Sequence, residues 1–188
     1  MINLFIPAAF TALLIRAKDA FQFSAANLHE NYTFLQDLFI NEFSSDPDRP
    51  PAFLVRKTVK AFIDDAIIIP HPTLPDTYNI TSSGYKKLVY FAGLLTPFFE
   101  SYRVALGYLS STAEEDRDRS KTVKKIRSLG QKMFKHGDIT RRESLSVPCY
   151  TNAVDSYTKN GLKGPRGAEK LSQYNNNIAR YLKILSAG

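Results

Sequence analysis

The sequence contains one cysteine and no tryptophan. Cys149 is the single thiol among 188 residues, so an internal disulfide and a zinc site built from several cysteines are both excluded. Such sparse cysteine usage is typical of a reducing compartment, and we predict a cytoplasmic location. Cys149 follows a proline and has no histidine nearby in sequence. We therefore predict a buried, inert thiol at this position.

Long apolar runs are also missing. A membrane-spanning helix needs about 20 consecutive apolar residues, whereas the best candidate, 88–99, is short and contains Thr96 and Pro97. The apolar start of the chain has neither a basic leader nor a clear cleavage site. It predicts a packed helix beginning near Pro7 rather than a signal peptide.

Catalytic motifs are scarce. The sequence has no P-loop, no G-x-G-x-x-G and no G-x-S-x-G motif, and its 3 histidines are scattered, which disfavours a metal site. His71 and Asp76 have the H-x-x-x-x-D spacing of a general base and its orienting carboxylate in acyl transfer. Pro72 and Pro75 hold that span in an extended loop, which favours a turn histidine. We therefore predict no catalytic residue, no metal and no cofactor.

Positive charge is what the sequence has in excess. Its 25 basic and 18 acidic side chains give a net charge of +7, which favours nucleic acid, a phospholipid surface or a phosphorylated metabolite as partner. The candidate contacts to phosphate groups or anionic lipid are Lys121, Lys124, Lys132, Lys135, Arg141 and Arg142. A solvated helix face is the common alternative for such a set of lysines.

Residues 38–89 and 133–185 read as two copies of one pattern. Each copy predicts two helices, a short apolar segment stopped by proline, and a further helix entered through a tyrosine. The shared residues are Phe39, Val59, Pro70, Tyr78, Asn79, Tyr85 and Lys87 in the first copy, and Phe134, Val154, Pro165, Tyr174, Asn175, Tyr181 and Lys183 in the second. The predicted fold is mostly α, a helical bundle with short β wings, with two winged-helix-like repeats as one version of it. We expect domains at 1–82 and 83–188 that form one compact unit.

Apolar periodicity places the individual elements. It predicts helices at 7–22, 27–39, 53–63, 83–109, 121–136, 148–160 and 174–186, and a hairpin pairing 66–69 with 77–81. Pro97 is expected to kink or break the longest helix, and residues 111–119 and 163–170 are expected to be loops. The aromatic stripe on that helix predicts core or an interface, and the interface candidates are Phe91, Leu95, Phe98, Phe99 and Tyr102.

Three stretches carry a larger pattern. The long helix contains L-L-x-P-x-x-E-x-Y, with Leu94, Leu95, Pro97, Glu100 and Tyr102 at the fixed positions. An E-S-L-S segment at 143–146 follows, then Asn152–Val154, then Gly161 with Leu162; the chain opens with Asn3, Pro7, Leu13 and Leu14 in N-P-x-x-L-x-x-x-A-L-L-like places. This pattern resembles the C-terminal region of the glycerol-3-phosphate and dihydroxyacetone-phosphate acyltransferase family.

The resemblance implies a role without catalysis. In that family the catalytic and phosphate-binding blocks lie upstream, as H-x-x-x-x-D with an adjacent arginine or serine, G-x-x-F-I-R-R and F-P-E-G-x-R, and none of these blocks occurs here in its place. The chain is expected to be the non-catalytic C-terminal domain of a glycerol-3-phosphate-type O-acyltransferase of phospholipid biosynthesis, expressed alone or encoded separately. Its expected partners are the catalytic domain, in the same or a separate chain, and an anionic membrane surface, to which it would bind peripherally.

Two other functions remain open on the residues alone. A tandem winged-helix module would read nucleic acid with helices 52–64 and 148–160. Arg56, Lys57 and Lys60 of the first suit phosphates, but the second offers mainly Asp155, Thr158 and Lys159, which disfavours nucleic acid as a partner without excluding it. The third interpretation is a scaffold that binds another protein through the face spanning 91–108.

Overall fold

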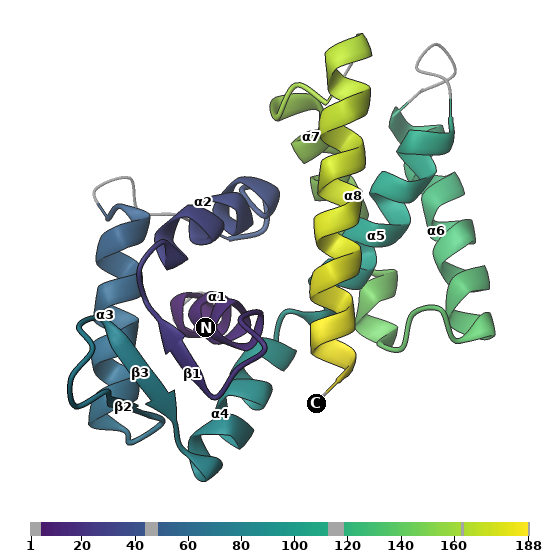
Figure 1. The fold of residues 1–188 in the computed structure, drawn as a ribbon. Coiled ribbons are helices and arrows are strands. Elements are labelled where there is room, and N and C mark those ends of the chain that lie inside the picture. Colours follow the sequence, from purple (N-terminus) through teal and green to yellow (C-terminus); the bar gives the residue numbers. More distant parts are fainter. Residues whose placement is uncertain (1–4, 44–48, 113–118, 163, 188) are drawn as a thin grey trace. The chain divides into compact units, whose positions relative to one another are not determined.

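The computed structural model describes residues 5–43, 49–112, 119–162 and 164–187 (Figure 1). The chain is mostly helical with one small sheet, which confirms the predicted fold class. Its contacts divide it into two units: Met1–Gln36, Phe43–Leu95 and Ile184–Gly188 form the first, and Asp37–Glu42 with Thr96–Lys183 form the second. The domain boundary expected between residues 82 and 83 stays a prediction. Residues 113–118 of the loop predicted at 111–119, residues 44–48 and Asn3 lie outside the described residues.

Helix α1 is the buried centre of the first unit. It spans Ile6–Arg16, carries a proline in its first turn and buries nine of its residues. Helices α3 (Pro51–Asp64) and α4 (Ser82–Gly93) pack against it. The helix ends earlier than predicted because Asp19 has a left-handed φ of 51°, after which the chain enters a strand. None of the helices in the described ranges is both long and apolar enough to cross a bilayer.

The first unit also holds a three-stranded antiparallel sheet of order β1-β3-β2. Its strands are β1 (Gln22–Ser24), β2 (Ile68–Pro70) and β3 (Thr77–Ile80). Ile68 pairs with Ile80, and Phe23 pairs with Tyr78. The side chains of Ile68 and Phe23 are buried, so the face of the sheet that carries them packs on the core. The predicted hairpin is confirmed. Strand β1 was not predicted, because three residues are too short to show alternation.

Thr81 fixes the start of α4 after the hairpin. Its hydroxyl accepts a hydrogen bond from Gly84 N (2.8 Å) and donates to Ala66 O (2.9 Å), so one side chain caps the helix and holds the preceding loop. The predicted helix 83–109 is broken, as expected, just ahead of Pro97: α4 ends at Gly93 and α5 (Thr96–Ser111) follows. Proline is tolerated only in the first turn of the new helix.

The second unit is helical. Its elements are the end of α2 (Leu28–Leu38), α5, α6 (Arg119–His136), the 3₁₀ helix η3 (Arg142–Leu145), α7 (Val147–Lys159) and most of α8 (Gly164–Ser186). Helix α5 contacts α6, α7 and η3. Aromatic rings fill the centre: Phe39 lies 5.0 Å from Phe99 and 4.9 Å from Tyr102, between ring centroids, and Phe99 lies 5.5 Å from Tyr181.

The second copy of the sequence repeat has a different structure from the first. Residues 164–186 form one helix, so Tyr174 and Asn175, the counterparts of strand residues Tyr78 and Asn79, are helical, and the loop expected at 163–170 is helical from Gly164 onward. The residues buried along α8 are Gly167, Leu171, Tyr174, Ile178 and Tyr181. Because this three-to-four-residue spacing buries one helical face, helix is favoured over a second wing. In the described chain the wing belongs to the first copy alone.

Candidate functional site

A groove of about 520 Å³ is open on the first unit. One wall is α3, and the facing wall comes from the loop and first turn that lead into α2 and from β3. Its lining residues are Ala25, Ala26, Asn27, His29, Ala52, Val55, Arg56, Val59, Lys60, Ile63, Asp76 and Tyr78. The groove is therefore largely apolar, with a few charged groups among its lining residues. Apolar periodicity predicted the helix that forms one wall, whereas no local pattern in the sequence places the facing wall.

His71 and Asp76 do not form the catalytic pair that their spacing allows. The His71 ring stays within its own turn, where Nδ1 accepts hydrogen bonds from Thr73 N (3.3 Å) and Leu74 N (3.1 Å). Asp76 has a left-handed φ of 49° and lines the groove. No hydrogen bond joins His71 to Asp76 within the described ranges, so the turn-histidine interpretation agrees with the geometry.

Glu100 is the centre of a polar cluster in the second unit. This carboxylate is 4% exposed. It accepts hydrogen bonds from Thr140 N (2.7 Å), Thr140 Oγ1 (2.9 Å), Arg141 N (2.9 Å) and Ser144 Oγ (2.5 Å). Ser101 Oγ donates to Ser144 O (2.9 Å) beside it. All of these donors hold the segment entering η3 against α5, so Glu100 acts as a structural anchor.

Cys149 and Glu42 form a second, smaller cluster. Cys149 Sγ lies 3.8 Å from Glu42 Oε2. Burial is the main cause that raises the pKa of the thiol, and the nearby Glu42 carboxylate raises it further. A raised pKa lowers the thiolate fraction, as expected for an inert thiol. Burial also raises the pKa of Glu42. Glu42 Oε1 and the hydroxyl of Tyr102 are both buried, and the side chains of Asn152 and Tyr102 offset only part of the effect of burial on the pKa of Glu42.

The pH dependence of Glu42 can be tested. The folded-state pKa of Glu42 is raised, chiefly by burial, above the ordinary value of 4.5, so the ionised group destabilises the fold at neutral pH. That cost diminishes as the pH falls through the raised pKa toward 4.5. Glu42→Gln should therefore be more stable than the wild type at pH 7, and the difference should shrink in acid, as measured by thermal unfolding from pH 7 to 4.5.

The control for that experiment is Glu169→Gln, which removes the same charge from an exposed position on α8. The difference in thermal stability between Glu169→Gln and the wild type should be small and should vary little with pH. A Glu42→Gln protein that is less stable than the wild type at neutral pH would contradict the assignment of an ionisation penalty to Glu42.

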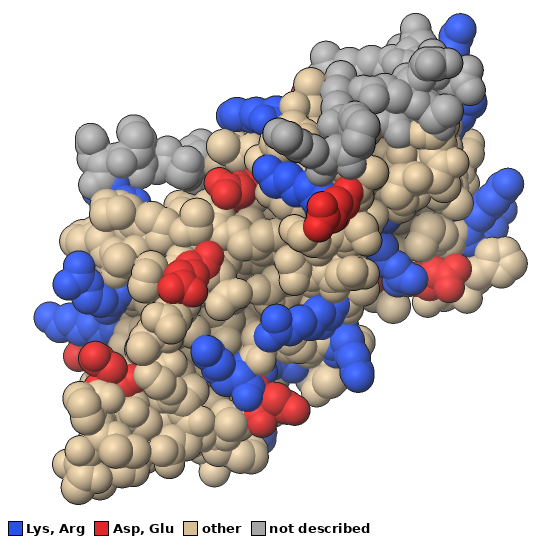
Figure 2. Space-filling model, turned by 45° about the horizontal axis from the view of Figure 1, so that its top comes forward, with Lys and Arg blue, Asp and Glu red and all other residues tan. Residues whose placement is uncertain are grey.

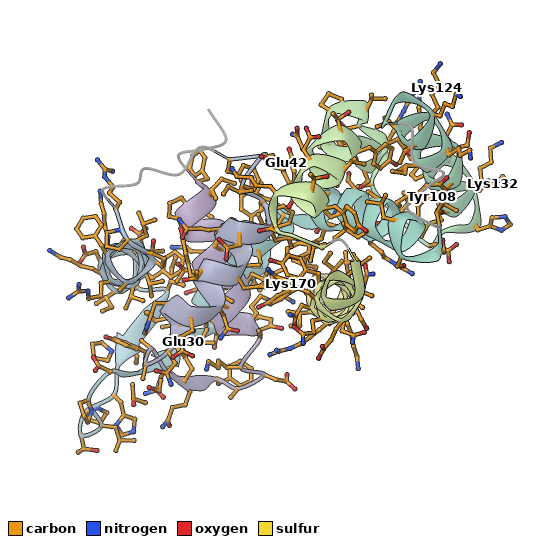
Figure 3. All side chains as sticks on the ribbon, turned by 90° about the horizontal axis from the view of Figure 1, so that it is seen from above. Glu30, Glu42, Tyr108, Lys124, Lys132 and Lys170 are labelled. Carbon is orange, nitrogen blue, oxygen red and sulfur yellow. The ribbon has the colours of Figure 1, made fainter. Side chains whose placement is uncertain are left out.

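The predicted anion contacts lie on the surface of the second unit. Lys121, Lys124, Lys132 and Lys135 are exposed on α6, and Arg141 and Arg142 are exposed at the start of η3. Spacings of three and eight residues put the four lysines on one flank of α6, opposite the buried Ile126. In Figure 3 the labelled Lys124 and Lys132 project outward from that helix. The sequence of α6 has no acidic residue, although basic and acidic side chains are interspersed over the face drawn in Figure 2.

The predicted interface residues are mostly core. Leu95, Phe99 and Tyr102 are each 0% exposed, because α5 presents Phe99 and Tyr102 to the aromatic cluster around Phe39. Phe91 and Phe98 keep partial exposure. An interface role stays a prediction for these two residues. Tyr90, outside the predicted set, is 72% exposed.

The described side chains provide no group of three histidine, cysteine, aspartate or glutamate residues that could hold a metal ion. The clusters that are present, around Glu100 and Glu42, pair carboxylates with hydroxyl, amide and thiol groups rather than with a histidine base. Their geometry supports anchoring of loops and helices.

A sequence model described as the glycerol-3-phosphate acyltransferase C-terminal region matches residues 1–166. The dihydroxyacetone phosphate acyltransferase of Homo sapiens is 23% identical over 167 residues, covering 86% of this chain and 23% of that protein. The enzyme of the same name from Oryctolagus cuniculus is 22% identical over 166 residues, with 86% and 23% covered. The chain thus spans 23% of the length of the curated relatives it matches.

Proposed function

This chain belongs to the family of glycerol-3-phosphate acyltransferase C-terminal regions, and we propose that it is a non-catalytic domain that docks on an acyltransferase catalytic domain. The enzyme it serves transfers an acyl group to glycerol 3-phosphate or a closely similar phosphate in phospholipid biosynthesis. The observation that carries the proposal is the family match over residues 1–166, in a chain whose described polar clusters anchor structure.

The residues of the family-like pattern support a structural role. Glu100 and Ser144 bind each other, and Ser146 caps α7 by accepting from Cys149 N at 3.5 Å. Gly161 adopts a left-handed φ of 63° directly after α7, which glycine does at little cost. Each of these residues therefore has a local task in folding. None is positioned beside a general base or an activated nucleophile in the described residues.

The lysine flank of α6, defined by Lys121, Lys124, Lys132 and Lys135, supports contact with an anionic membrane. Four exposed cations on one side of a helix without acidic residues form the kind of surface that attracts anionic lipid headgroups. The attraction is electrostatic, so it requires no inserted segment. We place the domain peripherally at the membrane, with α6 toward the lipid.

The proposal is tested by measuring acyl transfer from acyl-CoA to glycerol 3-phosphate and to dihydroxyacetone phosphate. The purified chain alone should show no turnover. Added to an acyltransferase catalytic domain of the same family, it should co-purify with that domain and raise its turnover on vesicles that contain anionic lipid. Robust turnover by the chain alone would refute the non-catalytic role, and failure to co-purify would refute docking.

A charge variant separates docking from membrane contact. Lys124→Glu with Lys132→Glu should lower turnover of the complex on anionic vesicles while leaving turnover in neutral detergent micelles unchanged. The matched control is Lys57→Glu with Lys86→Glu, which reverses two exposed lysines of the first unit. Equal losses for both pairs would show that net charge, and not the flank of α6, matters.

A further inference from the structure

The groove of the first unit combines two kinds of surface on one helix. Val55, Val59 and Ile63 stand at steps of four residues along α3 and line the groove, so they form a continuous apolar wall. Arg56 and Lys60 are also four residues apart, line the same groove, and are exposed. A cationic edge therefore runs parallel to the apolar wall.

The cationic edge has no acidic partner among the residues that the structure describes. Arg56 Nε donates to Ala52 O (3.3 Å), a carbonyl of its own helix. Neither Arg56 nor Lys60 forms an ion pair in the part of the chain that the structure describes. Among the described lining residues, Asp76 is the single acidic one, against the basic Arg56 and Lys60, and His29 adds an imidazole ring. The lining thus carries an excess of positive charge beside apolar surface, which complements a negatively charged group.

The dimensions suit one slender ligand. The volume of about 520 Å³ lies within the range of roughly 300 to 1,000 Å³ that holds small molecules. The apolar wall extends from Ala52 to Ile63, which at the helical rise per residue is about 16 Å. A linear hydrocarbon chain fits such a wall, with its charged end beside Arg56 and Lys60.

We propose that this groove binds a single-chain amphiphile with an anionic head group, a phosphate or a carboxylate on one long alkyl or acyl chain. The chain lies along Val55, Val59 and Ile63, and the head group pairs with Arg56 and Lys60. The bound molecule is a free monomer rather than a lipid of a bilayer surface, because the groove has a second wall, with Ala26 and Tyr78, besides that of α3. This binding role goes beyond the proposed function, and it lies within one unit, so it does not depend on docking.

The test is isothermal titration of the full chain with dodecyl phosphate below its critical micelle concentration. Saturable one-to-one binding is expected. Inorganic phosphate, and dodecyl maltoside as a neutral molecule with the same chain, should each bind at least about tenfold more weakly, because each supplies only one half of the recognition. Association that begins only above the micelle concentration, or with anionic vesicles alone, would overturn the proposal.

Two variants locate the site. Arg56→Glu with Lys60→Glu should weaken dodecyl phosphate binding by about tenfold or more, whereas Lys57→Glu, an exposed lysine of the same helix outside the groove lining, should change it little. Ala26→Trp should block the groove from an exposed loop position, and Ala61→Trp, on the exposed side of α3, is its control. Circular dichroism checks that each variant is folded. Unchanged binding in folded Ala26→Trp would refute the location.

Discussion

Replacing Glu100 by alanine is expected to reduce the free energy of unfolding by about 3 kcal/mol or more. The carboxylate accepts from two backbone N–H groups and two hydroxyls of the segment 140–144. Alanine removes the acceptor from the buried Ser144 hydroxyl and from the part-buried donors of Thr140 and Arg141, and an unsatisfied buried donor carries a desolvation cost. Urea unfolding monitored by circular dichroism measures the change.

Two companion variants make the Glu100 result specific. Glu100→Gln keeps the size of the side chain and one acceptor oxygen, but its amide nitrogen faces donors and cannot accept from them. The stability of this variant should therefore lie between those of Glu100→Ala and the wild type. Glu143→Ala removes an exposed carboxylate from the same segment and should change stability by less than about 0.5 kcal/mol. Equal losses of unfolding free energy in Glu100→Ala and Glu143→Ala would contradict a stabilising role of the hydrogen bonds to Glu100.

The second large effect is expected for Gly84→Ala, which should lower stability by about 3 kcal/mol or prevent folding of the first unit. A Cβ at this position would collide with the carbonyl oxygen of Ile67 and come within 2.6 Å of both Ile67 C and Thr81 Oγ1. Ile67 contributes backbone atoms next to β2, which cannot move without disturbing the hairpin. Thermal unfolding of the variant measures the effect.

Gly93→Ala is the control within the same helix. Nothing lies within 4 Å of a Cβ built on Gly93, and alanine is a better helix former than glycine by about 1 kcal/mol. Gly93→Ala should therefore leave stability unchanged or raise it slightly. If Gly84→Ala behaved like Gly93→Ala, the close approach of α4 to the backbone of Ile67 would have to be wrong.

Local signals predicted much of the fold. The helices predicted from 53, 83 and 148 begin within two residues of the observed α3, α4 and α7, because prolines and capping hydroxyls act through nearby backbone atoms. Strand β1 could not be predicted, since Phe23 becomes strand only by pairing with Tyr78 far along the chain. The prediction of a second wing was wrong. A few identities between the two copies are a weaker guide to structure than the three-to-four-residue apolar spacing along α8, which favours a helix.

The clusters and the groove were harder to foresee. Glu100 and Ser144 stood out as members of a pattern, but sequence spacing gave no sign that they touch, because a helix and a loop must fold back for the contact to exist. The same holds for Glu42 and Cys149. The groove exists only because the loop before α2 faces α3, and sequence spacing does not predict that contact. The lysine flank of α6 could be predicted, because all four lysines lie on one helix and helical periodicity alone places them on one side.

The chain passes repeatedly between its two units. Asp37–Glu42 belongs to the second unit although its neighbours on both sides belong to the first, and Ile184–Gly188 returns to the first after the long second segment. A single cut in the polypeptide therefore cannot release either unit whole. A protease or a gene rearrangement acting at one point would leave both halves with missing pieces, so evolution can shuffle this module only as an undivided block.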